Sequence, residues 1–405
     1  MMSILVMKFG GTSVANLSRI KNLQQLVKKK ISNGHKQILV VVSAMSGVTN
    51  NLVQQYKKID FNINNPEYDV ILSTGEQYSS ALISTFLNKN GIKSRSILGW
   101  QIPIITDDKF SQARIEKINT EKILKLFKKF NVLVVAGFQG INLEDRITTL
   151  GRGGSDTSAV AIAVALKSKI CEIYTDVEGI FSSDPRVVKD AKKIKNITYE
   201  EILEMASLGS KVLHPRSVEL AMKYDINIHV RSSFKRKHGS MVVKEENKIE
   251  KEVVTGISAS ENDANISLKG IPDKPGVAGQ IFSILADADI NVDMIVQNIT
   301  DDGKFASITF TVPLDDCKKA LKVLRNSKIK FKKISFDTKI CKISIVGVGM
   351  KSNVGVAKVM FETLAKKNIN IKVISTSEIK ISVLIESHKK KVALNSLHKA
   401  YGLGL

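Results

Sequence analysis

The chain has 405 residues, enough for two or three domains that each bury a core. Its composition, 43% hydrophobic and 25% charged, is typical of a globular protein, and no apolar run reaches the roughly 18–20 residues that cross a bilayer. The formal charge is +22, but only ten of the 61 basic residues are arginine and the lysines are spread along the whole chain, whereas nucleic-acid binders concentrate their charge on one face. We therefore expect no nucleic acid and no membrane as a partner, and a surface that attracts anionic substrates.

The N-terminus and the cysteines favour a cytoplasmic protein. The first residues lack the charged region and the cleavage site of a signal peptide. Cys171, Cys317 and Cys341 are odd in number and scattered, which is typical of reduced thiols and offers no metal-ligand spacing. We expect no metal site built from protein side chains.

The first predicted element is a buried strand at residues 4–9, which the glycine turn Gly10–Ser13 connects to an amphipathic segment at 17–31. Strand, glycine turn and helix form an arrangement that holds phosphate, although here the lysine precedes the glycines, unlike the G-x-x-x-x-G-K-[ST] loop. Lys8 lies among apolar neighbours, where a lysine is costly to bury without a partner. This favours a functional role over that of a surface lysine at a strand end.

Further strand ends carry small polar residues. Residues 38–42 form a second buried-type strand that ends in the small and polar segment 43–50. We expect a strand at 70–72 that leads into a turn, Ser73–Glu76, and brings one carboxylate to the same edge. The remaining elements expected before residue 180 are strands at 96–105, 132–136 and 170–175 and a basic helix at 121–130.

Residues 148–159, T-T-L-G-R-G-G-S-D-T-S-A, stand directly before the alanine-rich run 159–166. The pattern predicts a loop that delivers its last residues to the N-terminus of a buried helix, where free N–H groups attract negative charge. Arg152 adds a planar fork suited to a carboxylate or phosphate. Alone, the stretch is equally a glycine-rich turn with a capping side chain. Two similar clusters, at the N-terminus and at 175–186, favour an anion-binding active site.

Alternating strands and helices predict an α/β fold with a mainly parallel sheet sandwiched by helices. Ligands of such sheets bind beyond the carboxyl ends of the strands, and each cluster described above falls at such an end. We expect this catalytic domain at 1–250, with a last strand at 226–230 and a polar linker at 234–251. A helix is expected to end near 207–215, where a turn brings Lys211 round.

The C-terminal part contains an internal repeat. Ile266–Gly270 matches Ile343–Gly347, and the G-V-A of Gly276 recurs at Gly355. The repeat predicts a small α+β module present twice, at 262–336 and 340–405. The modules carry no nucleophile, base or metal set, so they are either a structural dimerisation domain or a small-ligand sensor, and pairing would serve both. Few residues follow the last helix, expected at 388–400, so the second module lacks its closing strand or borrows one.

Four segments in this order resemble bacterial aspartate kinases: K-F-G-G-T-S-V at 8–14, S-T-G-E at 73–76, 149–156 and 175–186. That family has the amino-acid kinase fold followed by two ACT domains, each βαββαβ, and the resemblance covers essentially the whole chain. It implies MgATP-dependent phosphorylation of the side-chain carboxylate of L-aspartate to 4-phospho-L-aspartate. This is the first step toward lysine, threonine, methionine and diaminopimelate.

The resemblance also implies residue roles. Lys8 contacts the transferring phosphate, Asp156 orients Lys8, and Arg152 completes the catalytic set. A carboxylate nucleophile with a pKa of about 4 is ionised at neutral pH, so no general base is needed. The nucleotide would contact Lys8, Phe9, Gly10, Gly11, Ser43, Thr175, Asp176, Phe181, Arg186, Lys211 and Val212. Aspartate would contact Thr49, Glu76, Arg152, Gly153, Gly154 and Ser155, with Glu76 and Arg152 taking its amino and carboxylate groups. Phe181 stands where relatives often have Tyr, so stacking remains but a hydroxyl contact is lost.

Regulation by lysine or threonine is implied for the repeats. In the first module the implied effector residues are Asp273, Gly276, Ala278, Gly279, Asn291, Val292, Asp293 and Gln297. In the second they are Asn370, Ile371, Thr376 and Ser377. Pairing of the modules into a homo-oligomer would let an effector bias the kinase between two states. Met241 stands just before the repeats, near where some relatives start a separate regulatory subunit, and whether it is an internal start stays open.

Two other functions fit the sequence less well. Another amino-acid kinase, for glutamate, acetylglutamate or a nucleoside monophosphate, is disfavoured by the ACT-like pair and by T-G-E. A non-catalytic amino-acid sensor with a decayed kinase half is disfavoured because Lys8, Glu76, Arg152, Asp156 and Asp176 are all intact.

Overall fold

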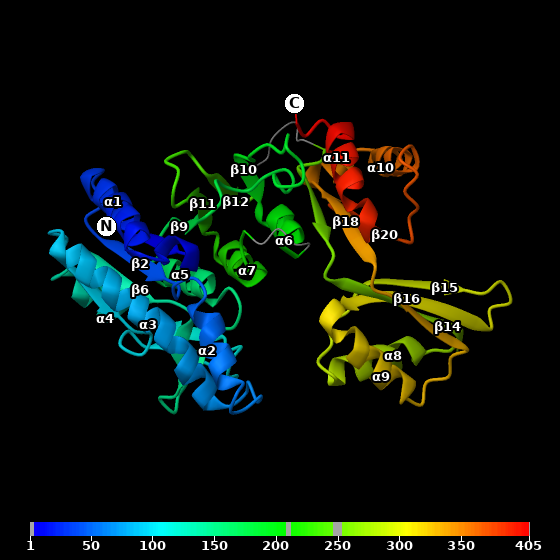
Figure 1. Ribbon diagram of the computed structural model, residues 1–405, viewed down its shortest axis with the longest axis horizontal. Coiled ribbons are helices and arrows are strands. Elements are labelled where there is room, and N and C mark those ends of the chain that lie inside the picture. The colour runs from blue at the N-terminus through cyan, green and yellow to red at the C-terminus, as the bar shows by residue number, and fades with distance from the viewer. Residues whose placement is uncertain (1–3, 208–211, 246–252, 405) are drawn as a thin grey trace. The chain divides into compact units, whose positions relative to one another are not determined.

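The computed structural model describes residues 4–207, 212–245 and 253–404 (Figure 1). The chain divides into two compact units. The first consists of Met1–Ile180, Lys193–Ala206 and Lys211–Asn247, and the second of Phe181–Lys192, Ser207–Ser210 and Lys248–Leu405. Within the described ranges, no helix is both long enough and apolar enough to span a membrane.

An eight-stranded sheet forms the centre of the first unit, in the order β10-β12-β11-β9-β1-β2-β6-β3. Every neighbouring pair is parallel except β11 and β12, which confirms the mainly parallel sheet. All residues of β1, β2 and β6 are buried, as expected of apolar strands covered on both faces. The strands are β1 (Leu5–Phe9), β2 (Ile38–Val42), β3 (Ser94–Ile97), β6 (Val132–Ala136), β9 (Ile170–Thr175), β10 (Asn196–Thr198), β11 (Asn227–Ser232) and β12 (Ser240–Val243).

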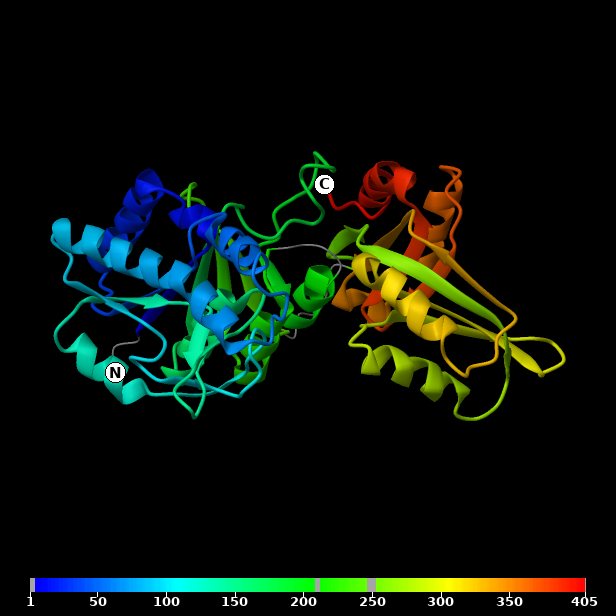
Figure 2. The ribbon, with the colours of Figure 1, turned by 60° about the horizontal axis from the view of Figure 1, so that its bottom comes forward.

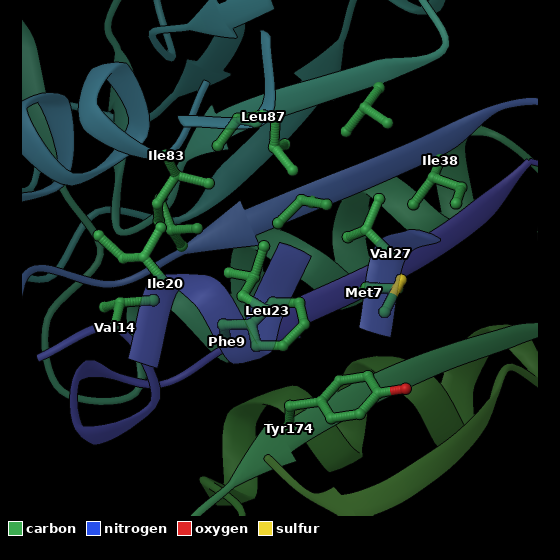
Figure 3. Packing of buried hydrophobic residues seen from close by; sticks show 14 of the residues in the cluster. Met7, Phe9, Val14, Ile20, Leu23, Val27, Ile38, Ile83, Leu87 and Tyr174 are labelled. Carbon is green, nitrogen blue, oxygen red and sulfur yellow. The ribbon is translucent and has the colours of Figure 1, made fainter. Parts of the chain in front are cut away.

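Helices cover both faces of this sheet. α1 (Leu17–Ser32) and α3 (Pro66–Lys89) pack against one face (Figures 1 and 2). Their apolar side chains meet Met7 and Phe9 of β1 (Figure 3). Because side chains alternate along a strand, Lys8 points to the other face, which α5 (Gly154–Ala165) covers. The remaining helical elements of this unit are η1 (Gly11–Val14), α2 (Val48–Tyr56), α4 (Thr120–Phe127), α6 (Tyr199–Ser207) and α7 (Pro215–Tyr224).

A second, small sheet of the first unit leads into the glycine-rich loop. Its order is β5-β4-β7-β8, and the loop follows its last strand directly. The strand pair expected at 96–105 is therefore split between sheets, since β3 joins the large sheet and β4 the small one. The strands are β4 (Ile104–Thr106), β5 (Ile115–Ile118), β7 (Gln139–Ile141) and β8 (Ile147–Thr149).

Two sequence expectations for the first unit are wrong. Ser73–Glu76 is not a strand-end turn but lies inside α3, which begins at Pro66 behind an Asn65 side chain that accepts from the Glu67 N–H at 3.0 Å. The three apolar residues 70–72 belong to this 24-residue helix. Likewise, β11 is not the last strand, because the expected linker contains β12, whose Val242 is buried. Lys211 lies outside the described residues.

The second unit contains the two α+β modules. The first module follows βαββαβ, with antiparallel strand order β15-β16-β14-β17 and both helices side by side. Its elements are β14 (Asp263–Pro272), α8 (Val277–Asp287), β15 (Asp293–Ile299), β16 (Phe305–Pro313), η2 (Leu314–Asp316), α9 (Cys317–Arg325) and β17 (Lys333–Asp337).

The second module borrows its closing strand. Its order is β13-β18-β20-β19, so β13 takes the place that β17 has in the first module. β18 is buried along its whole length and needs a neighbour on each side, and β13 comes from the chain before the first module. The elements are β13 (Gly256–Ser260), β18 (Ile340–Val346), η3 (Val348–Ser352), α10 (Val356–Ala365), β19 (Val373–Thr376), β20 (Lys380–Glu386), η4 (Ser387–Lys389) and α11 (Lys390–Ala400).

The segment Phe181–Lys192, inside the range expected for the catalytic domain, packs with the second unit. Val188 is buried in the core of the second module. The carbonyl of Ser182 accepts from the Ile257 N–H at 2.7 Å, and the Ser182 hydroxyl lies 2.9 Å from Nε2 of His398. This segment therefore belongs to the body that holds the repeats.

Candidate active site

A cleft of about 1630 Å³ opens in the first unit, beyond the carboxyl ends of β1 and β2 and beside α3 and the start of α5. It contains both Lys8 and Arg152, the two groups on which the sequence interpretation rests. The cleft is lined by these expected residues: Lys8, Ser43, Thr49, Glu76, Arg152, Gly153, Gly154, Ser155 and Asp156.

Lys8 and Asp156 form a buried ion pair. Lys8 is 9% exposed, and its Nζ lies 2.5 Å from Oδ1 of Asp156 in the first turn of α5. Burying an ammonium costs several kcal/mol unless a counter-charge compensates, and Asp156 is that counter-charge. The pair holds a cation at the floor of the cleft, where it can attract a phosphate.

The glycines after β1 allow a close approach of backbones. A Cβ on Gly11 would lie 2.7 Å from the carbonyl oxygen of Ala44, and one on Gly10 would lie 3.5 Å from Lys8 Nζ. The Gly10 N–H donates to the Tyr174 carbonyl at 3.1 Å. Phe9 stacks on Tyr174 inside the core, with ring centroids 4.7 Å apart, so only its backbone can face a ligand (Figure 3).

The glycine-rich loop needs its glycines. Gly151 and Gly153 have left-handed φ values of 74° and 68°. A Cβ on Gly153 would lie 2.2 Å from Cγ of His214, and one on Gly154 2.7 Å from Cδ2 of Phe138. The predicted helix after the loop is α5, but it already starts at Gly154, before the alanine-rich run at 159–166, and Arg152 stays exposed. The loop thus presents a guanidinium to the cleft.

Glu76 is a buried carboxylate without a full set of partners. It is 3% exposed, and among the described residues its Oε2 has no hydrogen-bond partner. Burial raises the pKa of Glu76 to about 7, against the opposing effects of the Ala44 backbone N–H and the charge of Lys8. Gly75 lets α3 pack closely against Ala44, because a Cβ on Gly75 would lie 2.7 Å from Cβ of Ala44. Such a carboxylate suits a cationic group of a ligand.

The nucleotide candidates divide between the two units. Thr175 ends β9, next to β1 in the sheet, and its hydroxyl lies 3.1 Å from Oδ1 of Asp176. These two residues therefore stand at the same sheet edge as the glycine turn, and Val212 also belongs to the first unit. Phe181 and Arg186 belong to the second unit, where the Arg186 guanidinium pairs with Asp184 at 2.9 Å.

The effector candidates lie at the helix starts and strand ends of the modules. In the first module, Gly276 caps α8, which contains Ala278 and Gly279, and β15 carries Asp293 and Gln297. Asp273, Asn291 and Val292 lie in the connecting loops, and in the second module Asn370 and Ile371 precede β19, which ends at Thr376. The Ser377 N–H donates to the Lys380 carbonyl at 2.8 Å.

One effector candidate is already paired within the chain. Asp293 accepts from the buried Lys342 of the second module, with 2.9 Å between Oδ2 and Nζ. The two modules are therefore joined at this residue.

Three cleft-lining residues were missed from sequence, Phe138, His214 and Arg216, and so was the buried Asp69, which accepts from Thr149 of the cleft lining. Asp69 lies seven residues before Glu76 on α3, and it was missed because a strand was predicted at 70–72. Phe138 has a left-handed φ of 69°. The nearby glycines at 137 and 140 are the sequence signal for a turn at this position. Burial lowers the pKa of His214, which packs on Gly153. No local pattern identified Arg216.

Comparisons with known proteins agree with this geometry. The family model of the amino acid kinase family matches residues 3–232, and that of the ACT domain matches residues 265–327 and 343–401. An aspartate kinase of Pseudomonas putida is 47% identical over 405 residues, covering 99% of this chain and 98% of that protein.

Two solved structures of E. coli aspartokinase III are also similar. The complex with aspartate and ADP, described as the R-state, has a TM-score of 0.80 at 26% identity and covers 98% of this chain and 99% of that one. The complex with lysine and aspartate, described as the T-state, has a TM-score of 0.76 at 26% identity with the same coverage. Because a family model covers more than half of the chain and a full-length relative is 47% identical, the chain belongs to the aspartate kinases, enzymes of the amino acid kinase family that carry ACT domains.

Proposed function

We propose that this enzyme transfers the γ-phosphoryl group of ATP to the side-chain carboxylate of L-aspartate and forms 4-phospho-L-aspartate. The reaction would be the first step toward lysine, threonine, methionine and diaminopimelate. The observation that carries this proposal is one cleft that joins the Lys8–Asp156 ion pair, the partly unpartnered Glu76 carboxylate and the exposed Arg152 guanidinium. The E. coli relative bound to aspartate and ADP supports the same pair of ligands.

The cleft offers a complementary group for each charge of aspartate. We assign the ammonium of the substrate to Glu76 and its α-carboxylate to Arg152, a planar fork suited to two oxygens. Thr49 and residues 153–155 line the space between them. The side-chain carboxylate is then left to face Lys8. In the free enzyme, burial disfavours the charged form of Glu76. The ammonium group of the substrate would supply a cation that stabilises this form.

Phosphoryl transfer mainly requires positioning and charge stabilisation. The substrate carboxylate is ionised at neutral pH and attacks without a general base. Lys8, oriented by Asp156, would place its ammonium on the transferring phosphoryl group, and Gly10 and Gly11 would let the phosphates approach the backbone. We propose that Ser43, Thr175, Asp176, Lys211 and Val212 surround the nucleotide.

Mg²⁺ is proposed to enter with the nucleotide. Among the described residues, no group of three or more His, Cys, Asp or Glu side chains is arranged to hold a metal ion. We assign the ion mainly to phosphate oxygens and water, which are the usual ligands of nucleotide-bound Mg²⁺. When bound, the ion would neutralise the phosphate charge.

We also propose that lysine, threonine or both bind the ACT domains and inhibit the kinase, and that these domains pair chains into a homo-oligomer in the cytoplasm. The E. coli relative in complex with lysine supports an amino-acid effector. A separate regulatory chain started at Met241 would add a second subunit. Its presence would be seen as a short C-terminal product that disappears in M241L.

The test is aspartate-dependent release of ADP, with the acyl phosphate trapped by hydroxylamine. We expect turnover with L-aspartate and little with glutamate, N-acetylglutamate or a nucleoside monophosphate, and inhibition when lysine and threonine are added singly or together. Preferred turnover of another acceptor would refute the assigned substrate. Unchanged turnover with both amino acids present would refute the proposed regulation.

A further inference from the structure

Two charged side chains from different helices hold the segment that carries Arg152. Residues 111–113 run beside the start of the glycine-rich loop, and the Ala113 N–H donates to the Thr149 carbonyl at 2.9 Å. Asp69 of α3 and Arg216 of α7 each bind both of these segments. Neither role follows from the family motifs in the sequence.

Asp69 holds the two segments through their donors. Its side chain is completely buried, and its carboxylate accepts the Ser111 N–H at 2.9 Å, the Thr149 N–H at 2.6 Å and the Thr149 hydroxyl at 2.8 Å. Burial alone raises the pKa of Asp69, and these three donors stabilise its charged form. Removing the charge would leave buried N–H groups poorly paired, which is costly.

Arg216 holds the same two segments through their acceptors. One terminal nitrogen of its guanidinium donates to the Leu150 carbonyl at 2.8 Å and the other to the Ala113 carbonyl at 2.7 Å. The planar fork thus bridges two neutral carbonyls. Because its terminal nitrogens are committed to the backbone, Arg216 has a structural role in the cleft that differs from that of the exposed Arg152.

Asp69 and Arg216 together form a brace between the two segments. This brace acts where the loop turns toward the ligand. Gly151 follows Leu150 in a left-handed conformation, and a Cβ there would lie 2.9 Å from the Ser111 carbonyl oxygen. Arg152 comes next. On the other side, Asp69 lies seven residues, about two helical turns, before Glu76 on α3. The brace therefore ties the element that carries Arg152 to the helix that carries Glu76.

We propose that Asp69 and Arg216 are positioning residues that set the place of Arg152 relative to Glu76 and thereby the affinity for the amino-acid substrate. The inference rests on the proposed binding of aspartate between these two groups. Small displacements of a binding group are costly because the substrate must be held in a reactive orientation.

The first experiment compares two neighbouring threonines. T149V removes a hydroxyl that donates to Asp69, whereas T148V removes a buried hydroxyl that bonds only to Thr106, at 2.6 Å, among the side chains of the described residues. We expect T149V to raise the KM for aspartate about tenfold, with the KM for ATP changed less than about twofold, and T148V to leave both values near those of the wild type. Equal effects of the two variants on KM would overturn the proposal.

D69N and R216M extend the test, and R216K should restore part of the affinity because lysine can still donate to one carbonyl. In the R152A background, D69N and R216M should add little to the KM for aspartate, since each acts through Arg152. Fully additive effects would refute a positioning role. Should D69N fail to fold, T149V and R216M carry the test. Absence of aspartate turnover in the wild type would refute the proposed function itself, whereas wild-type turnover with unchanged KM in T149V and R216M refutes only the positioning role.

Discussion

Two buried glutamates of the first unit differ in how their charge is treated. Glu172 on β9 accepts from Lys30 at 2.6 Å, from Arg231 at 3.0 Å and from the Tyr174 hydroxyl at 2.9 Å. Burial raises the pKa of Glu172, but the contacts with Lys30 and Arg231 lower it by more. The pKa of Glu172 therefore lies below its usual value. Glu76 is as deeply buried, yet its pKa rises to about 7.

The difference separates a structural acid from one that awaits a ligand. The chain satisfies Glu172 itself, with cations from two other elements, and the group contributes to stability. Glu76 lacks such a cation at close range and keeps one oxygen without a hydrogen-bond partner among the described residues. A cleft that leaves a buried carboxylate in this state favours a cationic ligand, at the expense of the stability of the free enzyme.

The largest effect is expected for Lys8, which lines the same cleft as Glu76. K8A should lower kcat by about 10³-fold, because the variant lacks the cation proposed to stabilise the transferring phosphoryl group. K8A leaves the buried Asp156 carboxylate unpaired, so the unfolding temperature should fall, and calorimetry checks that the variant is still folded at the assay temperature. Turnover close to that of the wild type would remove Lys8 from the mechanism.

E76Q and E172Q test the difference between the two glutamates. E76Q should raise the KM for aspartate about 10- to 100-fold, because a charged hydrogen bond to the substrate ammonium is lost, without lowering stability. E172Q should do the reverse, and lower the free energy of unfolding by about 3 kcal/mol with a nearly unchanged KM, because it leaves buried cations unpaired. Steady-state kinetics and denaturant titration measure the two effects. A similar outcome for both variants would break the distinction.

A smaller effect is expected at the exposed Arg152. R152A should raise the KM for aspartate about tenfold and change kcat little, because solvent screens an exposed charge more than a buried one. A series of aspartate analogues measures this. An unchanged KM in R152A would refute its role as the carboxylate clamp.

The smallest effect is a dependence on pH. Glu76 binds a charged ammonium only when ionised, so between pH 8 and 6.5 the KM for aspartate should rise about fourfold, and this rise should be absent in E76Q. In the free enzyme the folded pKa of Glu76 is above its unfolded value, so its contribution to stability is present below about pH 4.5 and lost as the pH rises through about 7. Glu172 has the opposite sign, and its contribution is lost in acid. Parallel unfolding curves of the two variants against pH check both signs.

Local sequence determined several parts of this protein. Apolar runs without alternation identified the buried strands β1, β2 and β6, because a strand covered on both faces needs no polar side. Glycines before a helix start identified the loop at 151–154, because only glycine adopts its left-handed turns and close approaches. The ion pair of Lys8 with Asp156 was expected from the family motifs, and the structure contains it.

Tertiary structure decided the rest. The three apolar residues 70–72 suit a strand as well as a helix, and the packing of α3 against the sheet decides for the helix. The second module takes its closing strand from before the first, a pairing that no local pattern encodes. Asp69 and Arg216 acquire their roles only where segments distant in sequence meet. The reason is common to all three: a residue's chemistry is local, but the partners that satisfy a buried strand or charge are chosen by the packing of the whole unit.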